Sequence, residues 1–489
     1  MSSASEKNAQ ALKALFGDAA LAGRLSSTRI AVVTSSEQVP RSGSLLAEAL
    51  ADVLGRLWPN IDFSGSCAEW QLSVATDAAM SGGAPAGGLV CRWAPPYDCV
   101  VFIGTKMLSD VGYAIQVGAD DWQVMLGPQA YCGHGENPVA PAFAAAMSAA
   151  QVFKHVFEAE LAGMDVPPLQ ECSLDLRDLF GAPQLDVAPL DLRETHVFGV
   201  GAVSHGMVWL LENWPSTVSG VLNLVDQDKY GDSNGQRYAF MCQKNVGAPK
   251  VESVKARLDA AHPNLSVQAH TIDLNSYCAT RGYETQLYRV ISGLDSAEAR
   301  QHTALKLPER AVNMWTEGVR IGAGQYVPGD GGACLACGYI EKTDSPLDEV
   351  AEISQQTGIR PDLVRSLLDS GRGLTQQEAV MVAGHRGVEP DQFLGQPLRS
   401  VLPALCATGR IQLPNNSEAV DVPFAFASLF AGIAGFVMLL KDCLEDSRTS
   451  NGWTQHIFKK PTPRMLSQQY TNAQCVCCEA RTALTEIES

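Results

Sequence analysis

A strand that ends in two glycines and continues directly into a helix is the feature that most constrains this chain. The run His196–Gly201 (His-Val-Phe-Gly-Val-Gly) ends an apolar strand, and residues 202–213 continue as an apolar helix. Glycines at such a junction let the backbone approach a phosphate, and the start of the helix supplies free N–H groups. Two glycines can also serve packing alone. The junction therefore predicts an α/β layer and a nucleotide site that other residues must support.

Strands alternate with helices in two stretches of the chain. The first stretch has predicted strands at 28–34, 100–103 and 122–126, and predicted helices at 43–58 and 137–163. The second has predicted strands up to 198 and at 221–225, 266–272 and 287–291, and helices at 202–213 and 249–261. This alternation is typical of a parallel sheet covered by helices. We expect two α/β halves, which amounts to a gross internal duplication.

Composition divides the rest of the chain. Residues 345–404 are charged and helical in pattern, which predicts an inserted helical subdomain, and residues 424–445 form a long apolar helix. The expected domains are an α/β domain at 1–163, a linker at 164–193, a second α/β domain at 194–338, a helical insertion at 339–421, and the C-terminal helix and tail of the second domain at 422–489.

Charge and hydropathy exclude some classes of partner. The net charge of −17 argues against a nucleic-acid backbone as a partner. No apolar run reaches the length of a membrane span, because the best candidate, 422–440, is interrupted by Pro423, Ser428 and two glycines. The first ten residues are polar and lack an apolar signal core. We expect a cytoplasmic protein that contacts neither membrane nor nucleic acid.

Three short segments strengthen the nucleotide site. They read Val-Asp-Gln-Asp at 225–228, Ser-Asn-Gly-Gln-Arg at 233–237 and Val-Gly-Ala-Pro-Lys at 246–250. Their order and spacing resemble the signature of the ThiF/MoeB and ubiquitin-activating enzyme superfamily: an acidic strand end, a Ser-Asn-x-x-Arg turn, and a Gly-x-Pro-Lys segment that opens a helix. This chain departs from that signature twice, with Ser204 in place of a glycine and Tyr238 in place of a glutamine.

The resemblance implies an ATP site with assigned roles. Gly199 and Gly201 would form the phosphate-binding turn, and Asp226 would hold the ribose. Arg237 and Lys250 would bind the triphosphate and offset the charge that builds on pyrophosphate as it leaves. The remaining implied ligands are Asn234, which would bind phosphate or order the turn; Asp228, which would support the arginine; and Asp295, which would coordinate Mg²⁺.

Two Cys-x-x-Cys pairs predict a structural zinc site. Cys334 and Cys337 form one pair, and Cys475 and Cys478 form the other, about 138 positions later. Four thiolates suit a closed tetrahedral Zn²⁺ site that ties the C-terminal tail to the second domain, and the superfamily carries zinc pairs in these places. Cys477 could replace Cys475 or Cys478, and a pair of redox dithiols is the alternative.

A further cysteine is the candidate nucleophile. Cys406 lies in the sequence Ala-Leu-Cys-Ala-Thr-Gly at 404–409, shortly before the apolar helix. This resembles the Cys-x-x-Gly segment that carries the reactive cysteine in some ThiF-like proteins. A thiolate there needs nearby positive charge, which Arg410 could supply. The alternative is a buried apolar cysteine.

The first half lacks the signature of the second. After its first strand the chain reads Thr-Ser-Ser-Glu at 34–37, without the glycine turn, the arginine turn or the lysine segment. We expect a degenerate adenylation half that packs against the active one. In relatives an arginine near the start of the partner half reaches ATP, which makes Arg24 and Arg29 candidates without a supporting motif.

The resemblance implies an activating enzyme. It would use ATP to adenylate the C-terminus of a ubiquitin-like protein, form a thioester and pass the protein to a conjugating enzyme. The arrangement most resembles the activating enzymes of bacterial ubiquitin-like conjugation operons of the Bil antiphage type. The alternatives are activation of a sulfur-carrier protein, a non-catalytic scaffold and, last, a nicotinamide dehydrogenase. Whether the chain forms a homodimer stays open.

Overall fold

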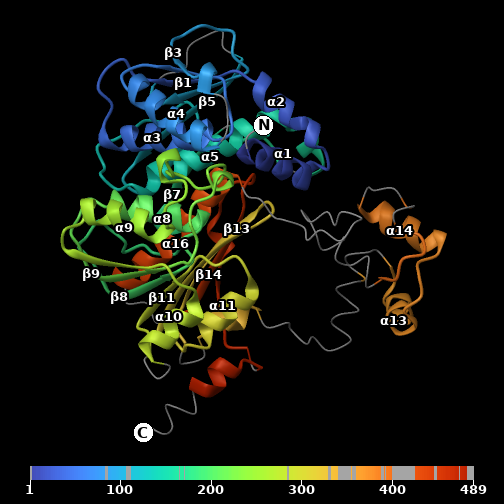
Figure 1. The fold of residues 1–489 in the computed structure, drawn as a ribbon. Helices are drawn as coiled ribbons and strands as arrows, with labels where there is room; N and C mark the ends of the chain where they lie inside the picture. Colours follow the sequence, from blue (N-terminus) through green and yellow to red (C-terminus); the bar gives the residue numbers. More distant parts are fainter. Residues whose placement is uncertain are drawn as a thin grey trace. The chain divides into compact units, whose positions relative to one another are not determined.

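The protein divides into two compact units. One unit comprises Met1–Ile340 with Val422–Ser489, and the other comprises Glu341–Asp421. The computed structural model describes residues 3–82, 86–105, 112–164, 166–169, 171–282, 286–328, 332–339, 354, 359–386, 390, 393–398, 424–444, 449–472 and 474–481. Figure 1 shows the fold with the sequence running from blue to red.

The first α/β half of the larger unit contains a seven-stranded sheet in the order β3-β2-β1-β4-β5-β6-β7. Strands β1 to β5 run parallel, and β6 and β7 are antiparallel to their neighbours. The bounds are β1 Ile30–Thr34, β2 Ile61–Ser64, β3 Val90–Cys91, β4 Cys99–Ile103, β5 Tyr113–Asp120, β6 Gln123–Leu126 and β7 Cys172–Asp175. Strand β4 is buried along its whole length, which explains its unbroken apolar sequence.

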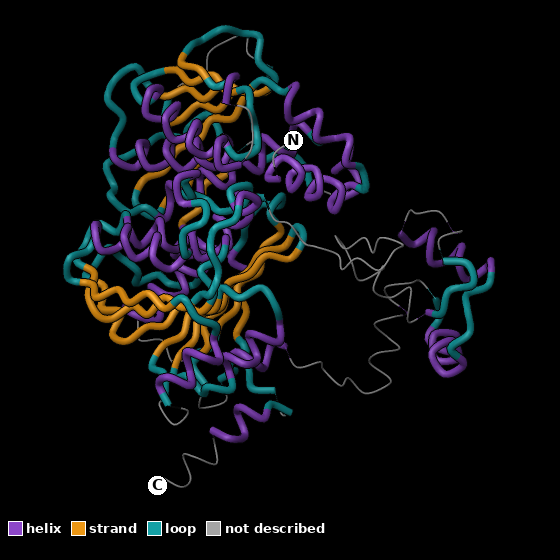
Figure 2. Tube along the Cα trace, in the orientation of Figure 1, coloured by secondary structure: helices purple, strands orange, loops and turns teal. Residues whose placement is uncertain are grey.

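The second half contains an eight-stranded sheet in the order β10-β9-β8-β11-β12-β13-β14-β15. Its first five strands are parallel and follow the order third, second, first, fourth, fifth, as in the first sheet. The bounds are β8 Leu190–Phe198, β9 Val218–Val225, β10 Leu265–His270, β11 Arg289–Ser292, β12 Arg310–Glu317, β13 Arg320–Tyr326, β14 Asn451–His456 and β15 Leu466–Gln468. The two mixed sheets confirm the predicted α/β class (Figure 2).

Helices accompany both sheets (Figures 1 and 2). The first half has α1 Ser3–Phe16, α2 Ala22–Ser27, α3 Arg41–Gly55, α4 Ala68–Gly82, α5 Val139–Val156, α6 Glu158–Leu161 and α7 Leu176–Leu179. The second has α8 Ala202–Glu212, α9 Lys250–Ala261, α10 Leu274–Arg281, α11 Ala297–Ala304 and α16 Ala425–Leu444. Short 3₁₀ turns include η4 Asp232–Asn234, η5 Gln243–Asn245 and η6 Leu335–Tyr339.

Helix α16 joins the cores of the two halves. It is long and apolar enough to span a membrane, but 89% of its apolar window is buried inside the protein, as expected of a core helix. Its Phe430 meets Phe143 of α5 edge to face, with ring centroids 4.7 Å apart. On the other side a Cβ at Gly432 would lie 2.5 Å from the carbonyl oxygen of Val203, so only glycine permits this approach to α8.

The segment expected as a linker, 164–193, contains regular structure. Residues 172–175 form β7, which pairs with β6 at the edge of the first sheet, and β8 already begins at Leu190. A four-residue edge strand is too short to show a clear period in the sequence. Helix α1 likewise occupies a start of the chain that had been expected only to be polar.

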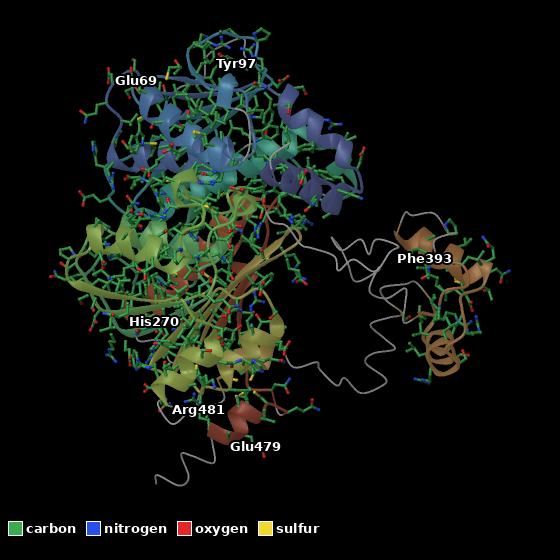
Figure 3. All side chains as sticks on the ribbon, in the orientation of Figure 1. Glu69, Tyr97, His270, Phe393, Glu479 and Arg481 are labelled. Carbon is green, nitrogen blue, oxygen red and sulfur yellow. The ribbon has the colours of Figure 1, made fainter. Side chains whose placement is uncertain are left out.

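The smaller unit has a helical core of its own within its described residues. Helices α13 Pro361–Ser370 and α14 Gln376–Arg386 pack around nine buried apolar side chains, among them Phe393 (Figure 3). Thr375 and Glu378 form a reciprocal capping box at the start of α14. Arg372 donates to Glu378, and this hydrogen bond lowers the pKa of the carboxyl to about 2. Cys406 lies outside the described residues.

Candidate functional site

The glycine turn lies where the strand order of the second sheet reverses. Strand β8 has β9 on one side and β11 on the other, and ligands of open α/β sheets bind beyond the carboxyl ends of the strands at such a point. Gly199 adopts a φ of +83°, and a Cβ there would lie 3.0 Å from the carbonyl oxygen of Gly293 after β11. The predicted glycine therefore has a conformational and a steric reason to be glycine.

Ser204, the first departure from the superfamily signature, is fully buried in the first turn of α8. Its Oγ donates to the carbonyl oxygen of Gly199 over 2.7 Å. The hydroxyl thus stabilises the turn from the side of α8. Gly201 precedes the helix as its N-cap, and the first amides of a helix have no intrahelical partners. The turn keeps the features that anion binding requires.

Asp226 joins the end of β9 to the glycine turn. One carboxylate oxygen accepts a hydrogen bond from the Val200 amide over 2.8 Å, and the other accepts from the Asp228 amide over 2.8 Å. Burial raises the pKa of Asp226, while nearby Lys250 acts in the opposite direction. The carboxylate fixes the backbone of the turn and keeps lone pairs for a further donor.

Lys250 opens α9 and is buried, with 5% of its surface exposed. Its Nζ lies 2.8 Å from an Asp228 oxygen and 3.9 Å from an Asp226 oxygen. Burial lowers its pKa, but Tyr238 and the two aspartates outweigh burial, so the pKa lies above the usual value. Lys250 is therefore a fixed cation beside the glycine turn and differs from a solvated helix charge.

The arginine turn follows β9. The Asn234 side-chain oxygen accepts a hydrogen bond from the Gly231 amide over 2.9 Å, so in this structure the asparagine orders the turn. Arg237 is half-buried, and its guanidinium lies 5.5 Å from the ring centroid of Tyr238. Among the described residues its guanidinium makes one hydrogen bond, a weak one of 3.4 Å to the carbonyl oxygen of Ser233. Most of its donors therefore remain available for an anion.

Tyr238, the second departure, lies close to both cations. Its ring centroid is 5.5 Å from the Arg237 guanidinium and 5.6 Å from Lys250 Nζ, both within the range of cation–π attraction. Its hydroxyl oxygen lies 4.0 Å from the position a Cβ would take at Gly201. Tyrosine thus keeps both cations together beside the turn. The sequence had marked this position as a departure but had assigned it no role.

His205 is a supporting residue that the sequence did not single out. Its Nδ1 lies 2.8 Å from the carbonyl oxygen of Gly201, and its Nε2 contacts the hydroxyl of Tyr230. Burial lowers its pKa to about 3, so the ring is neutral and bridges the turn and the segment after β9. Only its place one turn into the helix, four residues after a glycine, could have indicated this role.

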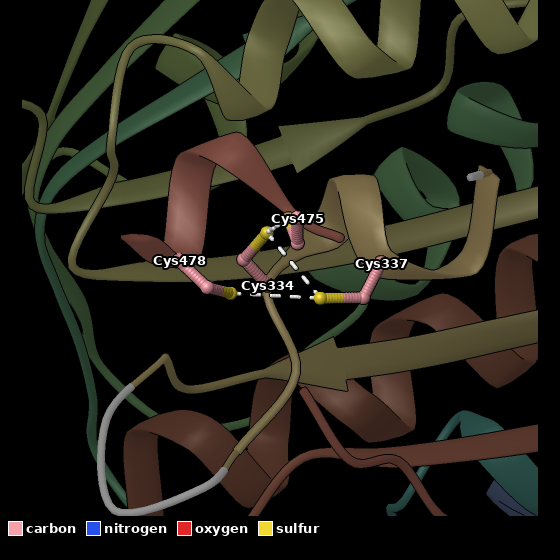
Figure 4. Close-up of side chains that lie close together, drawn as sticks. All are labelled: Cys334, Cys337, Cys475 and Cys478. Carbon is pink, nitrogen blue, oxygen red and sulfur yellow. Dashed lines mark hydrogen bonds between the residues drawn. The ribbon is translucent and has the colours of Figure 1, made fainter. Parts of the chain in front are cut away.

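Four cysteines from two distant segments of the chain lie close together (Figure 4). They are Cys334, Cys337, Cys475 and Cys478, with all four sulfurs within 4.8 Å of one another. Neighbouring sulfurs are 3.4 to 3.8 Å apart. A tetrahedral ion with Zn–S bonds of about 2.3 Å requires sulfurs about 3.8 Å apart, so the cluster fits zinc. The structure thus selects Cys475 and Cys478 for the cluster.

The same cluster anchors the tail of the chain. The amide of Asn472 donates to the Cys337 sulfur over 3.4 Å. Arg481, labelled in Figure 3, donates to the carbonyl oxygen of Pro308 over 2.6 Å. Two segments that are about 138 positions apart therefore meet around one set of thiols, as the sequence predicted.

Residues 180–452 match the family described as ThiF family, which is more than half of the chain. The chain belongs to the ThiF family. Members of the ThiF family are ATP-dependent adenylyltransferases. The matched region includes the glycine turn, the arginine turn and Lys250, so the site just described lies inside the family domain.

Individual relatives add less. The uncharacterized protein y4jF of Sinorhizobium fredii is 35% identical over an alignment of 341 residues that covers 66% of this chain. The chain spans about 64% of that relative's length. A crystal structure of E. coli MccB with MccA-N7isoASN is 14% identical, covers 59% of this chain and 67% of MccB, and has a TM-score of 0.35. MccB with ATP is 13% identical, with 59% and 68% covered and a TM-score of 0.36. Likeness at this level establishes no activity or substrate.

The remaining predicted residues differ in how the structure places them. Asp295 is exposed between β11 and α11, two residues beyond Gly293, and makes no hydrogen bond with any described residue. Arg24 pairs with Glu160, and Arg29 donates to Asp62 and to backbone carbonyls of the first half. These two arginines therefore serve the first half in this structure. The residues described around the glycine turn all belong to the second half.

Proposed function

We propose that this ThiF-family chain activates a ubiquitin-like protein by adenylating its C-terminal carboxylate with ATP. The observation that carries the proposal is the buried, charged Lys250 beside the glycine turn, held between Asp226 and Asp228. A buried cation is costly unless it is paired, and here its partners sit on the loop after β9. The incoming triphosphate would take over the pairing with Lys250.

The proposed reaction is an in-line displacement. An oxygen of the substrate carboxylate attacks the α-phosphorus of ATP, the bond from that phosphorus to the bridging oxygen breaks, and pyrophosphate leaves with the electron pair. Arg237 and Lys250 offset the negative charge that builds on the pyrophosphate. Preorganised cations in a partly buried site act more strongly than they would in water.

Other site residues take supporting roles in this proposal. Asp226 would bind the ribose with the lone pairs that the Val200 and Asp228 amides leave free. Asp295 offers an exposed carboxylate beyond β11, the kind of single oxygen ligand that Mg²⁺ takes beside phosphates. When bound, Mg²⁺ would neutralise part of the phosphate charge. Zn²⁺ at the four cysteines would be structural, because the donor set leaves no open position.

A second step is part of the proposal. The Cys406 thiolate would attack the acyl carbon of the adenylate, AMP would leave, and the thioester would pass to a ubiquitin-conjugating-type enzyme. This step, the cytoplasmic location and a role in bacterial antiphage defence rest on the resemblance of the sequence alone. Activation of a sulfur-carrier protein would use the same first step without the thioester transfer.

The test measures pyrophosphate release and AMP transfer with candidate ubiquitin-like proteins encoded beside the gene. Wild type is compared with Lys250→Ala and with Lys255→Ala, a matched lysine on the same helix that bonds to Asp259 and to the carbonyl oxygen of Val267. We expect Lys250→Ala to slow pyrophosphate release at least about a hundredfold. Lys255→Ala should stay within about twofold of wild type, because surface ion pairs contribute little.

The outcomes distinguish activation of a ubiquitin-like protein from activation of a sulfur-carrier protein and from a non-catalytic scaffold. Loss of adenylation in Lys250→Ala alone supports the proposal, and a reducible protein adduct that disappears in Cys406→Ala supports the second step. An adenylate without an adduct favours the sulfur-carrier alternative. If wild type makes no adenylate with any candidate and does not bind ATP, the proposed function is wrong and the scaffold reading takes its place.

A further inference from the structure

The end of α3 in the first half reaches the arginine turn of the second half. Asp52 and the residue just after the helix, Arg56, form an ion pair with distances of 2.7 and 3.0 Å. Their side chains are 4% and 1% exposed. A buried ion pair gains little net stability, because removing both charges from water offsets their attraction. Stability alone therefore does not explain the pair, and its role is inferred from the other hydrogen bonds that the two side chains make.

Within the described part of the chain, the other hydrogen bonds of these two side chains go to the backbone of residues 235–241. Arg56 donates to the carbonyl oxygens of Gly235, over 2.6 Å, and Met241, over 2.9 Å. Asp52 accepts from the amide of Phe240 over 3.0 Å. One ion pair thus holds both ends of a seven-residue segment, and Arg237 lies inside that segment.

Further contacts from the first half press on the same segment. A Cβ at Gly235 would lie 1.8 Å from the carbonyl oxygen of Ser81, so α4 packs directly against the backbone there. Phe240 has a φ of +60°, an uncommon value for a residue with a side chain, and its ring stacks on Trp209 with centroids 4.6 Å apart. The Trp209 indole donates in turn to Glu48 of α3. The segment is fixed largely by groups of the first half.

We propose that Arg56 and Asp52 are positioning residues for Arg237, so that the first half sets the geometry of the phosphate site without touching the nucleotide. The inference rests on the proposed function, because Arg237 is taken to bind the triphosphate. It assigns a task to a half that lacks the site residues of its own.

The first test measures hydrogen exchange of residues 235–241 in the full chain. Arg56→Lys keeps the charge beside Asp52 but cannot reach both carbonyl oxygens with one ammonium group. Asp52→Asn is the second variant. The matched control is Asp62→Asn, a buried aspartate of the same half, also 4% exposed, whose partners Arg29, Arg92 and Tyr97 all belong to the first half.

We expect faster exchange in residues 235–241 for Arg56→Lys and Asp52→Asn, with strand β8 unchanged. Asp62→Asn should leave residues 235–241 as in wild type. Unchanged exchange in both test variants would overturn the inference whatever the chain binds, so this readout does not depend on the proposed function.

The second test measures the affinity of Mg·ATP in a double-mutant cycle. Arg56→Lys should weaken binding roughly tenfold to a hundredfold, since small misplacements of a binding group have effects of that size. In an Arg237→Ala background, Arg56→Lys should change the affinity less than about twofold. If the two effects multiply instead, Arg56 has only a general structural role and the inference is wrong. If wild type binds no ATP, the proposed function fails, while the exchange result still decides whether Arg56 and Asp52 hold residues 235–241 in place.

Discussion

The two halves of the larger unit share a strand order but differ in the loops that follow the carboxyl ends of their central strands. In the second half, Gly199 follows β8 and approaches Gly293, which follows β11. Asp226 accepts a hydrogen bond from the amide of Val200 in the glycine turn, and Lys250 lies 3.9 Å from Asp226. In the first half, the equivalent position lies beyond β1 and β4. There the chain folds back on itself: Ser42 at the start of α3 donates to the carbonyl oxygen of Gly133 over 2.6 Å.

Side chains complete this covering of the first half. A Cβ at Gly104, just after β4, would lie 2.8 Å from the Cys132 sulfur, and a Cβ at Gly43 would lie 3.2 Å from the Cys132 Cβ. Cys132 thus packs between the end of β4 and the start of α3. The same strand order therefore carries the candidate site in one half and a packed cysteine in the other, and the loops at the carboxyl edge of each sheet make the difference. This supports the proposal that the first half is a degenerate adenylation half.

The largest expected contrast concerns the arginines of the two halves. Arg237→Ala should lower the rate of adenylate formation by about 10²- to 10³-fold, because it removes a cation aimed at the leaving pyrophosphate. Arg41→Ala, at the start of α3 in the first half, should change the rate less than about twofold. Pyrophosphate release measures both. A large loss for Arg41→Ala would mean that the first half contacts the nucleotide.

The cysteines provide the next contrast. Cys334→Ser should remove about one zinc per chain and lower the melting temperature, since structural zinc contributes folding free energy directly. Cys132→Ser in the first half should keep the zinc content of wild type, although it disturbs the packing beside Gly104. Metal analysis and thermal melting follow both variants. An unchanged zinc content in Cys334→Ser would contradict the assigned cluster.

A matched pair of glycines tests the same comparison with smaller effects. Gly199 and Gly104 both have positive φ, +83° and +57°, so alanine is strained by about 1–2 kcal/mol at either position. Both variants should melt at lower temperature. Only Gly199→Ala should also weaken ATP binding, by roughly tenfold. Calorimetric titration measures the affinities, and an equal loss in Gly104→Ala would erase the distinction between the halves.

The smallest effect belongs to two tyrosines. Tyr238→Phe removes the hydroxyl near Gly201 but keeps the ring beside the two cations, so ATP affinity should fall by about threefold to tenfold, the value of one hydrogen bond. Tyr97→Phe removes a hydroxyl that bonds to Asp62 and to the Ala94 amide in the first half. That variant should lose stability and keep its ATP affinity. Unaltered affinity in Tyr238→Phe would restrict Tyr238 to holding the cations.

The sequence predicted what local patterns encode. The glycine turn, the acidic end of β9 and Lys250 at the start of α9 lie within about 50 residues, and their order alone indicated one site. The two Cys-x-x-Cys pairs also came together as predicted. The choice of Cys478 over Cys477 required the direction in which each sulfur points, which no spacing supplies.

The rest depended on contacts between distant segments. Nothing near Arg56 indicates that it bonds to Met241, 185 positions later. The short edge strand β7 and strands β13 to β15, which are antiparallel to their neighbours, depend on pairing with distant strands, so their sequences carry weak periodic signals. The packing of Cys132 against Gly104 and Gly43 could not be predicted from the sequence either, although the first half lacks the motifs of the second.

The central claim is that the second half alone carries the nucleotide site. The most direct test photocrosslinks 8-azido-ATP to the full chain under ultraviolet light. Mass spectrometry then identifies the labelled peptides, with excess ATP as the competitor. The account predicts label on peptides from residues 199–257 that ATP displaces. Displaceable label on peptides from residues 30–135 would place a nucleotide in the first half and contradict the account.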